Sequence, residues 1–277
     1  MGYKTILTVL TDENQRKQLD SAVAMTRRED AHLDVFCLGV DHTQTGFYYA
    51  GASAYVLQET IDKAVAAAAA LEEKVREWLR AEDIRWGVDS AVAQVGGLST
   101  LVGMRARYSD LVVLGRPYGE DATPDAEAIT EAALLEGAAP VLIVPDRLAE
   151  PFGRKIMIAW NQSNEALSAV RRALPLLKAA DAVEITVIDP SPNGPERSDP
   201  GGPLCQMLTR HGVKAEIAVL ARTMPQISDI IDHRAAEIGA DMIVMGAYSH
   251  SRFRQAILGG ATRNMLQKAR LPLFMAR

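Results

Sequence analysis

The sequence is poor in cysteine and has no long apolar run. Its 2 cysteines among 277 residues, Cys37 and Cys205, form no CxxC pair, so neither a disulfide framework nor a cysteine zinc site is indicated. No apolar run reaches the roughly 18 residues that a membrane helix needs, and the first residues lack the basic start and apolar stretch of a secretory signal. We therefore expect a cytoplasmic protein without a membrane partner.

An excess of positive charge is also missing. The chain has 30 Lys and Arg against 35 Asp and Glu, a net charge of -5. Binding to nucleic acid needs clustered Lys and Arg, so we expect no nucleic-acid partner. The 5 histidines show no HExxH spacing, and neither GxSxG nor GxxxxGK[ST] occurs. The sequence therefore indicates no metal site and no catalytic residues, which favours a protein that is not an enzyme.

The sequence contains an internal duplication. Three short apolar segments of the first half recur in order in the second: KTILTVL (Lys4–Leu10) with KIMIAW (Lys155–Trp160), DLVVLG (Asp110–Gly115) with DMIVMG (Asp241–Gly246), and PVLIVP (Pro140–Pro145) with PLFMA (Pro272–Ala276). Such strands, separated by amphipathic helices, are typical of a parallel sheet covered on both faces. We predict an α/β protein of two tandem doubly wound units of about five strands each, residues 1–148 and 153–277.

The loop after the strand that ends at Gly246 is the strongest candidate for a binding site. Ligands of open parallel sheets bind outside the carboxyl ends of the strands. We expect Gly246 to leave the strand with positive φ, and Gly259 and Gly260 to let backbone N–H groups at a helix start approach a phosphate. Thr262 adds a hydroxyl. A glycine pair before a helix is by itself a weak signal and is more often a tight turn without a ligand, so this alternative stays open.

The duplicated halves and this loop resemble the universal stress protein family in its tandem form, over nearly the whole chain. Nucleotide-binding members of that family carry G-x2-G-x9-G-[ST] after a strand, and ATP phosphates lie against it. Gly246 and Gly259 match the first and third glycines, whereas Ser249 replaces the second glycine and Gly260 replaces the hydroxyl residue. Ala261 and Thr262 follow, and Thr262 is the substitute for the missing hydroxyl.

The resemblance also implies ligand contacts at the ends of two earlier strands. The family places an aspartate near the adenine after its first strand, and Asn161 stands at that position, where a turn or helix-cap role is the alternative. Val187 matches a position that touches the base, although a strand valine is more often part of the core. The implied fold is adenine nucleotide alpha hydrolase-like. The implied ligand is ATP or a related adenine nucleotide, with Mg²⁺ only together with ATP.

The first half departs further from the family pattern. Aligning the last strands of the halves puts Glu127 and Ala128 where Gly259 and Gly260 lie, and only Gly115 of the motif survives. A carboxylate there would repel a triphosphate. We expect a first half without nucleotide that packs against the second as a pseudo-dimer through the terminal strands, residues 140–144 and 272–275, with further homo-oligomerisation left open.

Two functions of different class remain. The first is a stress-response module that binds an adenine nucleotide in its second half with little or no hydrolysis, because the loop shows no general base or arginine finger. The second is a ligand-free interaction protein that recruits protein partners. The residues at Ser249 and Gly260 favour the second function more than a complete motif would.

Overall fold

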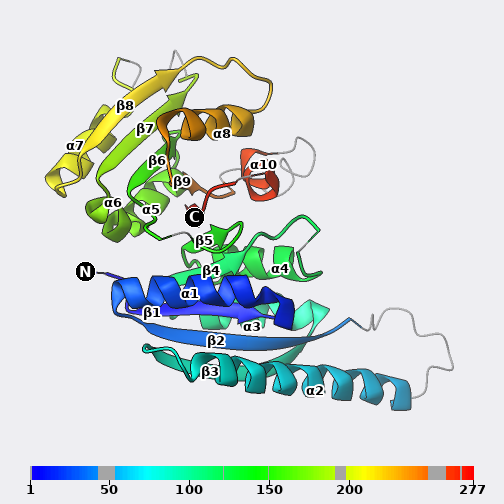
Figure 1. The fold of residues 1–277 in the computed structure, drawn as a ribbon. Helices are drawn as coiled ribbons and strands as arrows, with labels where there is room; N and C mark the ends of the chain where they lie inside the picture. Colours follow the sequence, from blue (N-terminus) through cyan, green and yellow to red (C-terminus); the bar gives the residue numbers. More distant parts are fainter. Residues whose placement is uncertain are drawn as a thin grey trace. The chain divides into compact units, whose positions relative to one another are not determined.

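The computed structural model describes residues 2–42, 54–120, 122–148, 150–190, 198–248, 260–268 and 270–277, and the side chains of residues 54–57 lie outside this description. Contacts divide the chain into two compact units, Gly2–Ala139 and Pro140–Arg277. Each unit is an α/β fold around a mainly parallel sheet (Figure 1). Within the described residues, no helix is both long and apolar enough to cross a membrane.

The first unit alternates strands and helices, as its sequence predicts. Its elements are β1 (Thr5–Leu10), η1 (Glu13–Gln15), α1 (Arg16–Glu29), β2 (His32–Asp41), α2 (Ala54–Leu79), β3 (Arg85–Gln94), α3 (Val95–Ala106), β4 (Leu111–Gly115), α4 (Ala126–Glu131) and the π-helical η2 (Ala132–Glu136). The strands lie in the order β3-β2-β1-β4, and the neighbouring strands described in this unit are parallel. Helix α2 runs alongside β3 (Figure 1).

Local sequence signals set where the continuous helical segment of η1 and α1 begins and ends. The Asp12 carboxylate accepts from the backbone N–H of Asn14 at 2.7 Å, and the Gln15 side chain accepts from the Asp12 N–H, which makes a capping box. The helix ends at Asp30, whose φ of 48° is left-handed. The apolar residues between these ends, among them Leu19 and Met25, are buried against the sheet.

The second unit repeats this plan. Its elements are β5 (Val141–Val144), β6 (Lys155–Trp160), α5 (Asn164–Arg172), α6 (Leu174–Ala179), β7 (Ala182–Ile188), α7 (Gly202–Arg210), β8 (Ala215–Leu220), α8 (Ile227–Ile238), β9 (Met242–Gly246), α10 (Ala261–Lys268) and β10 (Leu273–Ala276). The strands lie in the order β5-β10-β9-β6-β7-β8. Only the pairing of β5 with β10 is antiparallel among the described pairs of this unit.

The last strand of the first repeat belongs by its contacts to the second unit. Strand β5 pairs with β10, with Leu142 opposite Phe274, and β10 pairs on its other side with β9. The predicted pairing of the two terminal strands is therefore present, and β10 has a neighbour on both sides. The compact units consequently divide at Ala139, ahead of the polar segment in which the sequence alone places the boundary. Association of the complete halves as a pseudo-dimer stays a prediction.

The two units share a hydrogen-bond arrangement that is not visible in the apolar pattern. The Asp110 carboxylate accepts from the backbone N–H groups of Lys4 and Thr5 at 2.7 and 3.1 Å. In the second unit, the Asp241 carboxylate accepts from those of Arg154 and Lys155 at 2.8 and 3.1 Å. Each aspartate fixes the start of the first strand of its repeat against the start of the fourth. This equivalence supports the internal duplication independently of hydrophobicity.

Candidate functional site

The order of the strands in the second unit reverses between β6 and β9. From β6 the chain proceeds to β7 and β8 on one side, and it later returns to β9 on the other. The two strands are parallel, and Ala159 pairs with Met245, so both end at the same edge of the sheet. Asn161, directly after β6, and Gly246, the last residue of β9, therefore lie at the same edge. In open α/β sheets this is the position at which ligands bind.

Glycine is required at position 246 because the backbone of α5 approaches it closely, and not because of its own backbone conformation. Gly246 is absent from the glycines of positive φ in the described chain, and the left-handed residue is Tyr248, with φ of 54°. The expected positive φ at Gly246 is therefore wrong. A Cβ atom at Gly246 would lie 2.5 Å from the backbone nitrogen of Ala166, in the first turn of α5. Glycine allows α5 to begin directly against the end of β9.

Asn161 takes the turn role that the sequence left open. Its Oδ1 accepts from the backbone N–H of Ser163 at 3.2 Å, and the Ser163 hydroxyl in turn caps α5 by accepting from the Ala166 N–H at 3.1 Å. These hydrogen bonds orient the Asn161 side chain at the carboxyl edge of the sheet. A contact between Asn161 and a base stays a prediction, since the same side chain can serve both purposes.

Val187 lies in the core of the second unit. It is 2% exposed and pairs with Trp160 on β6 and Val219 on β8. Its neighbour Trp160 was not singled out from the sequence. The indole N–H of Trp160 is buried and has no hydrogen-bond partner among the described residues. An unpaired buried donor at the end of β6 marks a polar position beside Asn161, which no sequence pattern would have revealed.

The start of α10 is tied to the end of β9. The Thr262 hydroxyl is buried and accepts from the backbone N–H of Tyr248 at 3.3 Å, while the Gly260 carbonyl accepts from the N–H of Asn264 at 3.2 Å. Gly260, Ala261 and Thr262 are thereby brought to the same edge as Gly246. Ser249 and Gly259 lie outside the described residues.

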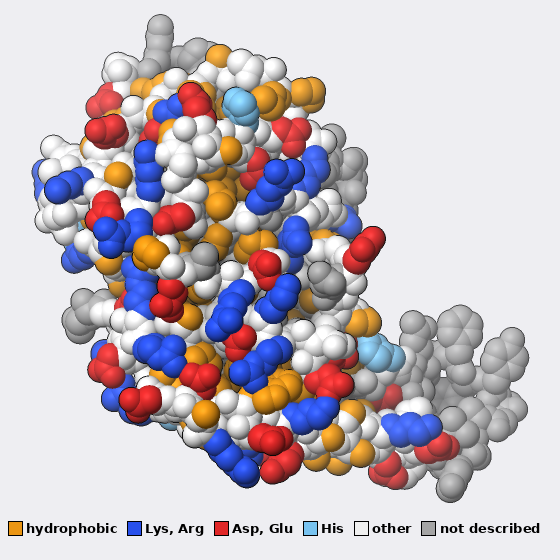
Figure 2. Space-filling model, in the orientation of Figure 1, with side chains coloured by type: hydrophobic (Ala, Val, Ile, Leu, Met, Phe, Trp, Pro, Cys, Tyr) orange, Lys and Arg blue, Asp and Glu red, His pale blue; other side chains and the backbone are white. Residues whose placement is uncertain are grey.

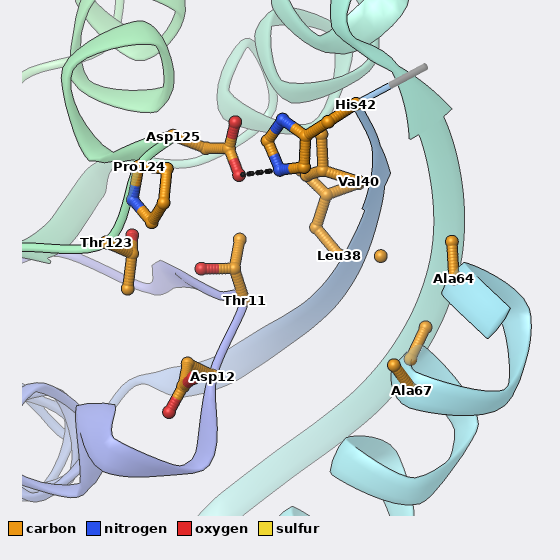
Figure 3. A pocket seen from close by; sticks show the side chains of 12 residues that line it. Thr11, Asp12, Leu38, Val40, His42, Ala64, Ala67, Thr123, Pro124 and Asp125 are labelled. Carbon is orange, nitrogen blue, oxygen red and sulfur yellow. Dashed lines mark ion pairs between the residues drawn. The ribbon is translucent and has the colours of Figure 1, made fainter. Parts of the chain in front are cut away.

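A pocket of the first unit was missed by sequence reasoning. It has a volume of about 200 Å³ and lies where β1 and β2 end, beside α2 (Figure 3). The sequence signal for this pocket is weak, because it consists only of one polar residue after each of two strands: Asp12 after β1 and His42 after β2. The sequence prediction for this half considered only a phosphate loop. Glu127, which aligns with Gly259 of the second half, is exposed and accepts a hydrogen bond from the Tyr118 hydroxyl at 2.6 Å.

The sequence of residues 153–277 matches the model of the universal stress protein family. This part of the chain belongs to that family. The universal stress protein domain includes β6 to β10 and therefore all the nucleotide-site residues predicted from the sequence, but not the pocket of the first unit. Among curated proteins, no significant match is found.

Solved structures of the same architecture span the complete chain. A universal stress protein from Archaeoglobus fulgidus DSM 4304 superposes with a TM-score of 0.71 at 15% identity, covering 99% of this chain and 96% of the other. A protein of unknown function from Pseudomonas aeruginosa PAO1 gives 0.61 at 16% identity, covering 99% and 92%. These likenesses establish the fold, which is that of two tandem α/β units, one of them a universal stress protein domain.

Proposed function

We propose that the protein is a cytoplasmic stress-response module whose universal stress protein domain binds an adenine nucleotide, ATP or ADP. The observation that supports this is the convergence of Asn161, Gly246 and Thr262 at the carboxyl edge where the strand order changes. The proposal also includes Val187, Ser249, Gly259, Gly260 and Ala261 as contacts. The second unit is the one that matches the family.

The roles follow from the chemistry of each position. Backbone N–H groups at the start of α10, at Gly260 and Ala261, would face the phosphates, because a helix N-terminus favours negative charge. Asn161 offers both an amide donor and an acceptor to an adenine edge. Mg²⁺ would enter only as the counterion of ATP. Hydrolysis would be slow, because the loop sequence supplies no assigned base and no arginine finger.

One observation favours a second function, that of a ligand-free interaction protein. The hydroxyl of Thr262, which is the substitute for the missing family hydroxyl, already accepts the Tyr248 N–H and is 6% exposed. If that bond is kept, Thr262 serves the fold and not a phosphate. Charged side chains of both signs are interspersed on the face drawn in Figure 2, so the charge of this face indicates no particular class of partner.

Calorimetric titration of the purified chain with ATP and ADP separates these functions. We expect micromolar binding by the natural sequence and at least a tenfold loss in Gly260→Glu, because a carboxylate at the start of α10 would repel the phosphates. The matched control is Ala128→Glu, which places the same charge at the aligned position of the first half and should leave binding unchanged. No binding at millimolar ATP would support the interaction protein instead.

A further inference from the structure

The pocket is formed by the first unit, whereas the nucleotide site proposed above belongs to the second. It opens at the carboxyl ends of β1 and β2, and all its lining residues belong to the first unit. One wall is apolar, formed by Leu38 and Val40 of β2 and by Ala64 and Ala67 of α2 (Figure 3). Its volume of about 200 Å³ is smaller than that of sites for drug-sized ligands. The wall suits a compact hydrocarbon or aromatic body.

The opposite side of the pocket carries a buried carboxylate. Asp125 is 9% exposed and precedes α4. Its Oδ2 lies 3.4 Å from Nε2 of His42, whose side chain is 55% exposed. Burial raises the pKa of Asp125, and the charge of His42 opposes that shift without cancelling it. The imidazole therefore offsets only part of the cost of burying the charged carboxylate. In Figure 3 the two side chains face each other across one end of the pocket.

A second polar group at this end of the pocket, the Thr123 hydroxyl, makes no hydrogen bond to the described residues. That hydroxyl oxygen is buried. Thr123 lies two positions before Asp125 and lines the same pocket. Buried polar atoms of native proteins are rarely left unpaired. The Thr123 hydroxyl can donate or accept, whereas an ionised Asp125 carboxylate only accepts, so a partner that bonds to both groups must be able to donate hydrogen bonds.

The charges around the pocket determine the sign of that partner. Asp12 supplies another carboxylate, already engaged with the N–H of Asn14 at 2.7 Å, and none of the described lining residues is a lysine or an arginine. Anionic ligands would therefore meet repulsion, whereas an ammonium or amidinium group would form charge-assisted hydrogen bonds. We infer that the first unit binds a compact organic cation, with its cationic group on Asp125 and its apolar body against β2 and α2.

Three planar probes of the same size test this inference. Benzamidine is cationic, benzamide is neutral and benzoate is anionic, and each has the same number of non-hydrogen atoms. Calorimetry or ligand-observed NMR on the full chain should rank them in that order, with about a tenfold or greater preference for benzamidine over benzoate. In Asp125→Asn this preference should disappear. The chain should remain folded, because a neutral amide is easier to bury than a carboxylate.

The chain supplies a matched control for the His–Asp pair. His32 Nε2 lies 3.3 Å from Asp34 Oδ1, but both side chains are about half exposed, at 44% and 49%. Asp34→Asn should leave the ranking unchanged. A second variant, Ala67→Phe, fills the pocket from an exposed position of α2 and should abolish benzamidine binding.

Several results would overturn the inference: equal or tighter binding of benzoate, no binding of any probe, or unchanged benzamidine binding in Asp125→Asn or Ala67→Phe. None of them bears on ATP binding by the second unit, which is measured separately.

Discussion

Replacing Phe274 by alanine is expected to lower the free energy of unfolding of the second unit by about 3–5 kcal/mol. Phe274 is 0% exposed and is among the largest fully buried side chains of the described structure. It lies on β10, opposite Leu142 of β5 and Val244 of β9. Its removal opens a cavity on the face of the sheet where these three strands meet. Urea denaturation followed by circular dichroism measures the change.

A second aromatic residue serves as the control for Phe274. Tyr108 follows α3 and is 81% exposed, so Tyr108→Ala should change the free energy of unfolding by less than about 0.5 kcal/mol. A loss at Phe274 no greater than that at Tyr108 would mean that β10 is not packed between β5 and β9.

Gly246→Ala is expected to destabilise the second unit by about 2–3 kcal/mol, a large effect for one methyl group. The new Cβ would meet backbone atoms at 2.5 Å on Ala166 and 2.8 Å on Glu165, and backbone cannot rotate away as a side chain can. Either β9 or the start of α5 must move. Thermal unfolding, monitored separately for the two units by hydrogen exchange, should show the loss in the second unit.

Two further glycines calibrate this prediction. Gly115 occupies the matched position of the first repeat, but its Cβ would meet the side-chain oxygen of Gln18 at 3.0 Å, so Gly115→Ala should cost less, about 1 kcal/mol. Gly96 in α3 has open space around a Cβ, and Gly96→Ala should stabilise by about 0.5–1 kcal/mol. Equal losses at Gly246 and Gly96 would contradict the close approach of α5 to β9.

The architecture could be predicted because it depends on local hydrophobic patterns that recur along the sequence. Apolar runs such as Leu111–Gly115 and Met242–Gly246 are short and nearly continuous, which is typical of buried parallel strands, and their recurrence identifies the duplication. The pairing of the terminal strands could be anticipated for the same reason, since both are apolar and need neighbours on each side.

The details of the site could not be predicted, because they depend on contacts between distant segments. Gly246 is explained by α5, whose first turn lies 80 residues away in sequence at Ala166, and the turn conformation falls instead on Tyr248. The pocket of the first unit joins His42 to Asp125, and neither residue lies in a motif. The unpaired indole of Trp160 is likewise a property of packing that the residue type does not reveal.

Photolabelling tests most directly the central claim that the carboxyl edge of β6 and β9 is a nucleotide site. The full chain would be irradiated with an azido derivative of ATP that carries the photoreactive group on adenine, digested, and mapped by mass spectrometry with and without excess ATP. We predict label that ATP displaces, confined to peptides of residues 153–277 and including the segment around Asn161. Displaceable label in residues 2–139, or no displaceable label at all, would contradict the claim.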